Sequence, residues 1–153
     1  MNSEIFKKSA LLGLVFVIFM ACSNSDDDPG MDTIQDQIEN NVQSGTWIIT
    51  YFNDSGVNET SNFSGFTFTF GANGVLTATS SSVSYTGTWS ISDSNSNDDS
   101  QDDLDFNIYF NLTNDFEDLV DDWDIQSQTS SKIELMDVSG GKGDTDYLTF
   151  EKN

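Results

Sequence analysis

The sequence predicts an all-β fold: an eight-stranded antiparallel up-and-down barrel with a short N-terminal helix and one short inserted helix. Three observations predict it. Several segments alternate apolar and polar residues with period two, which is typical of half-buried strands. Glycine- and asparagine-rich turns separate neighbouring segments, and about 110 residues remain after an N-terminal leader, a linker and a helix, enough for one domain. We expect the sheet to close, because closure pairs the edge strands.

The leader, residues 1–21, has the order of a secretory signal peptide. Lys7 and Lys8 precede an apolar run over residues 10–20. This run is shorter than the roughly 20 residues that a helix needs to cross a bilayer. We therefore expect the leader to be cleaved rather than to span the membrane.

The end of the leader, Phe-Met-Ala-Cys at residues 19–22, resembles the lipobox of bacterial lipoproteins, with Phe19 in place of the usual Leu. The resemblance implies that Cys22 is the acylated N-terminus and that the lipid membrane is a partner. Several acyl chains anchor a protein stably, whereas one does so only marginally. The alternative is a secreted protein with a free or buried cysteine.

An acidic segment follows Cys22 within a polar linker, residues 22–31. Its residues Ser25, Asp26, Asp27 and Asp28 resemble the export signal of Bacteroidetes lipoproteins. The resemblance implies a lipid-anchored protein in the outer membrane, facing the cell exterior. The alternative is a plain solvated linker, and in both cases the segment has no core of its own.

The first expected element is a helix over residues 32–44, because Ile34, Ile38 and Val42 recur at helical spacing. The barrel domain, residues 45–153, follows. Its expected strands lie near residues 46–53, 63–71, 74–80, 83–92, 104–113, 123–129, 131–138 and 145–151. Turn residues at 71–74 and 140–144 favour hairpins.

One insertion interrupts this series of strands. Residues 114–123 place Phe116, Leu119, Val120 and Trp123 on one helical face, with Asn114 as the cap. The spacing predicts a short helix over one end of the barrel.

Two short motifs carry a family resemblance. Gly45-Thr46-Trp47 opens the first strand, and Gly87-Thr88-Trp89 lies in the fourth. With the eight-strand series, they resemble the lipocalins and, more closely, the lipocalin-like domains of lipoproteins from Flavobacteria and their relatives. The resemblance implies that a small apolar molecule binds inside the barrel. The chain departs from lipocalins in lacking a cysteine pair and a long helix after the last strand.

The function that this resemblance implies is a surface-anchored lipoprotein that binds a small hydrophobic ligand. An eight-stranded barrel is just wide enough to be filled by side chains or to hold one small ligand. The alternative is therefore a non-catalytic structural or accessory interaction protein with a filled barrel. The candidate ligand-lining residues are Trp47, Tyr51, Phe68, Tyr85, Trp89, Phe106, Phe110 and Trp123.

Composition excludes several kinds of chemistry. The chain has no His, and its five Lys and Arg residues stand against 26 Asp and Glu, for a net charge of −21. Histidine-based catalysis is absent, and neither nucleotide-binding nor nucleophile motifs occur. Phosphate backbones would be repelled. We expect a protein that is not an enzyme, has no cofactor and does not bind nucleic acid.

The acidic loop 93–103 begins like a calcium-binding EF-hand loop, with Asp93, Asn95, Asn97 and Asp99 as weak candidate ligands. Its sixth position lacks the glycine of the turn, and its twelfth position is Leu104 instead of a bidentate Glu. We expect no specific metal site here.

Overall fold

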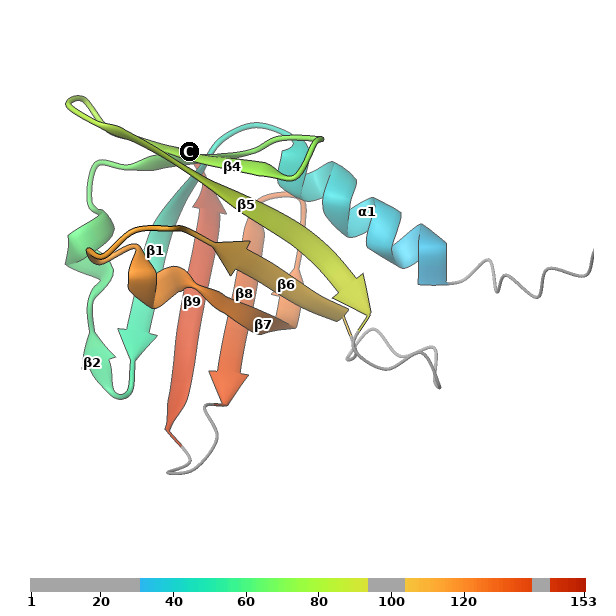
Figure 1. Cartoon of the computed structure of the whole chain (residues 1–153). Helices are drawn as coiled ribbons and strands as arrows, with labels where there is room; N and C mark the ends of the chain where they lie inside the picture. The colour runs from blue at the N-terminus through green and yellow to red at the C-terminus, as the bar shows by residue number, and fades with distance from the viewer. Residues whose placement is uncertain (1–30, 94–103, 139–143) are drawn as a thin grey trace, which may run out of the picture.

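The computed structural model describes residues 31–93, 104–138 and 144–153, and its strands close into an eight-stranded antiparallel barrel (Figure 1). The helices are α1 (Met31–Gln43) and the short 3-10 helices η1 (Thr60–Phe63) and η3 (Glu117–Leu119). The barrel strands are β1 (Trp47–Asp54), β3 (Thr67–Phe70), β4 (Val75–Thr79), β5 (Ser84–Asp93), β6 (Leu104–Tyr109), β7 (Asp121–Gln128), β8 (Lys132–Val138) and β9 (Thr145–Lys152). A two-residue strand, β2 (Val57–Asn58), pairs with the end of β1.

Consecutive strands from β3 to β9 pair in antiparallel order, as the turn residues predicted. The barrel closes where β9 pairs with β1, from Trp47–Lys152 to Asn53–Tyr147. On its other side β1 meets β3 only through the pair Trp47–Phe68. The long β1–β9 seam therefore provides most of the closure.

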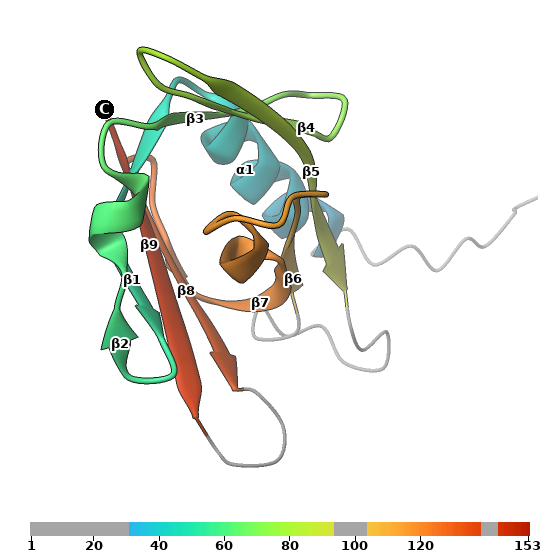
Figure 2. The same cartoon turned by 60° about the vertical axis from the view of Figure 1, so that its left-hand side comes forward.

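Both ends of the barrel are covered (Figure 2). The helix α1 lies across one end with Ile38 and Val42 buried, and the Gln35 amide donates to the Ile91 carbonyl. At the other end lie η1 and the connection that contains η3. Phe63 of η1 meets Phe116 of that connection edge to face, with ring centroids 5.4 Å apart.

The Gly-x-Trp motif joins α1 to the barrel. Gly45 has a φ of +95°, which suits glycine and turns the chain from the helix into β1. The buried Trp47 then donates its indole N–H to the Val42 carbonyl at 2.8 Å, so that it caps an otherwise unpaired carbonyl of the last helical turn. The motif thus fixes the position of the helix on the barrel.

The insertion between β6 and β7 is less helical than its spacing predicted. Only η3 forms, and β7 already begins at Asp121, which pairs with Ile108 of β6. Trp123 therefore belongs to a strand, and its indole N–H donates to the Leu119 carbonyl at 3.1 Å. The last three residues of the predicted helix, 121–123, therefore pair with β6 as part of strand β7.

The inward assignment of Tyr51 is wrong. The register of β1 on β9 shifts between Ile49 and Tyr51, which marks a β-bulge. A shift of one residue turns a side chain to the opposite face of a sheet. Tyr51 is consequently 40% exposed on the outside, and Phe52 is buried in its place.

Two predicted strands are also shorter than expected. The segment that was predicted to begin strand 63–71 forms η1 and a turn, so β3 starts only at Thr67. Strand β6 ends at Tyr109, and Leu112 beyond it is half-buried. In both cases the residues outside the shortened strand lie over the barrel end.

Gly87 permits a close approach inside the barrel. A Cβ atom at this position would lie 2.3 Å from the Tyr109 carbonyl oxygen and 2.7 Å from the Phe110 ring. Neither the β6 backbone nor a buried ring can move away freely. Glycine at position 87 is therefore required by packing.

We expect Gly87→Ala to lower the free energy of unfolding by about 1–3 kcal/mol, because the core must accommodate an extra methyl group. Urea denaturation of the purified chain measures it. Thr86→Ala, at an exposed position on the same strand, is the control and should change stability by less than about 0.5 kcal/mol. Equal effects of the two substitutions would contradict this account of Gly87.

Candidate functional site

The predicted ligand-lining residues occupy three kinds of position. Six of them are at most 5% exposed: Trp47, Phe68, Trp89, Phe106, Phe110 and Trp123. Tyr85 is half-buried at the barrel end, and Tyr51 lies outside. The structure thus brings most of the predicted set together in the barrel interior.

These rings pack against one another. Phe70 lies edge-on to Trp89, Phe106 and Phe150, with centroids 5.5 Å apart in each case. Edge-to-face contacts of this kind are favourable beyond the area that they bury. The middle of the barrel is therefore occupied by its own aromatic side chains.

Phe116 plugs the end of the barrel opposite α1. Its ring, 2% exposed, has its centroid within about 5–6 Å of the centroids of five other rings. They belong to Phe63, Phe66, Phe68, Tyr85 and Phe110, at 5.4, 5.0, 6.1, 4.9 and 5.1 Å. The Phe116 backbone N–H donates to the Asn114 side chain at 3.2 Å. The cap residue expected for a helix instead holds the turn that carries this plug.

Among the hollows lined by described residues are three whose linings contain no phenylalanine. One of about 320 Å³ lies on β5 and β6 beside Tyr109, and one of about 200 Å³ lies between α1 and the β3–β4 turn. The third, about 330 Å³, is lined by Tyr51, Gln126, Ser127, Glu134, Leu135, Tyr147 and Thr149. We call this third hollow the outer groove.

The outer groove runs across four strands of the barrel wall. Thr149 of β9 pairs with Tyr51 of β1 on one side and with Glu134 of β8 on the other, and Glu134 pairs with Ser127 of β7. Tyr147, two residues from Thr149, lies on the same face of β9. The groove therefore forms only when these four strands are paired in this register.

Two bulges flank the outer groove at the same level. One is the β1 bulge that turns Tyr51 outward, and the other is a register shift in β7 between Ile125 and Ser127. Bulges redirect side chains and are common beside functional sites. Here they place Tyr51 and Gln126 at opposite sides of the groove.

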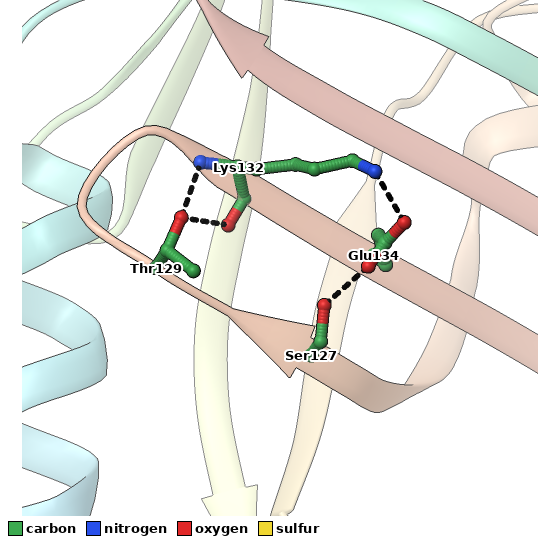
Figure 3. A network of polar contacts seen from close by, with 4 residues as sticks. All are labelled: Ser127, Thr129, Lys132 and Glu134. Carbon is green, nitrogen blue, oxygen red and sulfur yellow. Dashed lines mark hydrogen bonds and ion pairs between the residues drawn. The ribbon is translucent and has the colours of Figure 1, made fainter.

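Glu134 is held in place at the centre of the groove (Figure 3). Its carboxylate accepts hydrogen bonds from the Lys132 ammonium and the Ser127 hydroxyl. The pKa of Glu134 lies below its usual range, mainly because of the hydrogen bond from Lys132 and next because of the one from the Ser127 hydroxyl. Glu134 is thus an acceptor oriented by two donors, and Lys132 compensates part of its charge at this solvent-exposed position.

Side-chain hydrogen bonds also stabilise the turn between β7 and β8, which leads into Lys132. The Thr129 hydroxyl accepts the Lys132 backbone N–H at 3.0 Å and donates to the Lys132 carbonyl at 3.3 Å (Figure 3). These hydrogen bonds close the β7–β8 hairpin at Lys132.

Acidic residues gather at the plugged end of the barrel. The pKa of Glu59 is raised mainly by partial burial and next by repulsion from Asp118. The pKa of Asp118 is raised mainly by burial and next by repulsion from Asp54. Burial first, and then a hydrogen bond with Asp122, raises the pKa of Asp121 to about 6. This end therefore loses stability when its carboxyl groups ionise.

The remaining candidate residues fall largely outside the described residues. These are Cys22, Ser25, Asp26, Asp27, Asp28, Asn95, Asn97 and Asp99, whereas Asp93 ends β5. Within the described ranges, no group of three or more potential acidic or thiol ligands is arranged to hold a metal ion. None of the helices in this part of the chain has the length and apolar character to cross a membrane.

Asp121→Asn should stabilise the protein at pH 7 by about 1 kcal/mol, an amount reduced by partial solvent screening. A carboxyl group whose native pKa of about 6 exceeds its unfolded value of 3.8 binds more protons in the native state. Stability therefore falls as pH rises through this interval. Melting temperatures between pH 4 and 7 should decline less steeply in the variant.

Asp36→Asn, at an exposed position on α1, is the control for this experiment. Its melting curve should run parallel to that of the wild type over the same pH range. A wild-type slope in Asp121→Asn would show that this carboxyl group does not contribute.

Comparison with known proteins gives little sequence similarity. No family model matches the chain, and no curated protein matches it. Among solved structures it is similar to a DUF4847 family protein from Bacteroides vulgatus ATCC 8482, with 20% sequence identity and a TM-score of 0.49. The match covers 76% of this chain and 97% of the other.

Proposed function

We propose that this protein is a surface-anchored lipoprotein whose filled barrel is a rigid body for non-catalytic, accessory binding at the cell exterior. The observation that carries the proposal is the occupied interior: Phe70 and Phe116 each contact several rings in the space that a ligand would need. With the interior occupied, recognition falls to the outer surface. The lipobox-like Cys22 and the acidic segment after it support anchoring outside the cell.

Binding of a small hydrophobic ligand, the function implied by the lipocalin resemblance, is the second candidate. Phe66 and Tyr85, both half-buried and stacked with centroids 5.9 Å apart, lie beside Phe116 and favour it. A ligand entering here would have to displace Phe116 from its ring contacts. Loss of a buried aromatic ring costs about 3–5 kcal/mol, so weak ligands would be excluded.

An uncharged apolar fluorophore, N-phenyl-1-naphthylamine, distinguishes the two functions. We expect no saturable binding to the wild-type chain, because the interior is filled. Phe116→Ala should gain one saturable site, and Phe116→Leu is the milder variant if the first fails to fold. Tyr109→Ala, at a side chain 54% exposed on the outside, is the control without gain. Saturable binding to the wild type at micromolar concentration would favour the hydrophobic-ligand function.

Anchoring is tested in a Bacteroidetes host grown with an alkyne analogue of palmitate. We expect the wild-type chain to take up the label and to be digested by protease added to intact cells. Cys22→Ser should lose the label and the membrane association. Combined Asp26→Ala, Asp27→Ala and Asp28→Ala should keep the label but become protected from protease. Labelling of Cys22→Ser would refute lipidation at this residue.

A further inference from the structure

We propose that the outer groove binds a neutral saccharide, which names the ligand class for the accessory binding proposed above and rests on that proposal. The groove has a volume of about 330 Å³, at the lower end of the roughly 300–1,000 Å³ typical of ligand sites. This size suits a single sugar unit or a short stretch of a glycan chain. It is open to solvent on the barrel wall, where a long polymer can pass.

The first argument is the placement of two tyrosines. Tyr51 and Tyr147 are 40% and 42% exposed and line the same hollow, whereas Tyr109, 54% exposed, is the single exposed aromatic side chain in the lining of its hollow. Tyr51 faces the groove only because the β1 bulge redirects it. A tyrosine offers an apolar ring face together with a polar hydroxyl group. A pyranose offers the complementary surface, an apolar face of C–H groups surrounded by hydroxyl groups.

The second argument is the set of polar groups that line the groove together with the two rings. The Gln126 amide both donates and accepts, and the Thr149 hydroxyl does the same. The Glu134 carboxylate is an acceptor held in one position by Lys132 and Ser127 (Figure 3). Such a set matches hydroxyl groups, which also donate and accept, and its pre-organisation lowers the entropic cost of binding.

Charge decides against other ligand classes. The net charge of −21 disfavours anions such as phosphorylated or acidic ligands. Glu134 is the acidic group of the groove lining, and the Lys132 ammonium already compensates it at 2.5 Å. A cationic ligand would have to compete with that lysine. An uncharged ligand rich in hydroxyl groups avoids both penalties.

The test is an array of neutral, acidic and amino-modified glycans probed with the lipidated full chain in mild detergent, alongside a tetralysine peptide. We expect neutral glycans to be retained and the tetralysine peptide and acidic glycans not to be. Retention of the cationic or acidic probes alone, or of no probe, would overturn the proposal.

Variants locate the binding site. Tyr51→Ala and Tyr147→Ala should each weaken binding to the retained glycan by about tenfold or more, as expected when a ring at the centre of a contact is lost. Tyr51→Phe should stay within about threefold of the wild type, because the stacking face remains. Tyr109→Ala is the matched control on another part of the wall and should leave binding unchanged. Glycan binding that survives both alanine substitutions would place the site elsewhere.

These outcomes are separable from those of the proposed function. A protein that excludes the apolar fluorophore and is anchored through Cys22, but binds no neutral glycan, retains the proposed function and loses the saccharide inference. Uptake of the fluorophore by the wild type would instead contradict the filled barrel, whatever the glycan array shows. All the tyrosine substitutions lie at exposed side chains, so the melting temperature should change little.

Discussion

The aromatic packing inside the barrel is the constraint on which the rest of the structure depends. An eight-stranded barrel leaves just enough space for side chains, and here large rings such as Phe70 and Phe116 use it. Because these rings are rigid, the backbone has to adjust to them, as it does at Gly87 beside Phe110. The two barrel ends must also be covered, since otherwise the outermost rings would face water. The helix α1 and the connection that carries Phe116 meet that need.

With its interior filled, the barrel would recognise a ligand on its outer wall, as we propose. A regular wall would present a uniform surface of alternating strand residues, and selective recognition needs a departure from it. The bulges in β1 and β7 supply that departure at one level of the sheet. They leave the core intact, because the register shift that exposes Tyr51 buries Phe52. The β1 bulge therefore affects both faces of the sheet, because it packs Phe52 into the interior and turns Tyr51 into the lining of the outer groove.

The strand series could be predicted from the sequence because alternation reports burial directly, and the closed barrel follows from it. The position of Tyr51 could not, because a bulge leaves no trace in the alternation and reverses the faces on its far side. The helical spacing of four apolar residues predicts a helix up to Trp123, where the expected strand 123–129 begins, whereas pairing with β6 already starts at Asp121. The outer groove could not be predicted from the sequence, since Glu134 and Thr149 become neighbours only through strand pairing.

Cations are scarce in this chain, and their positions show where charge compensation matters. The two lysines within the described residues, Lys132 and Lys152, lie on the neighbouring strands β8 and β9. Lys152 donates to the Ser44 hydroxyl at 2.9 Å and lies 5.1 Å from the centre of the Trp47 ring, where α1 joins the barrel. Lys132 is bound to Glu134 in the outer groove. The acids at the plugged end have no such lysine within the described chain, so repulsion there is tolerated. One described lysine therefore lies where α1 joins the barrel, and the other lies beside the carboxylate of the outer groove, where it lowers the local charge that the proposed uncharged ligand would meet.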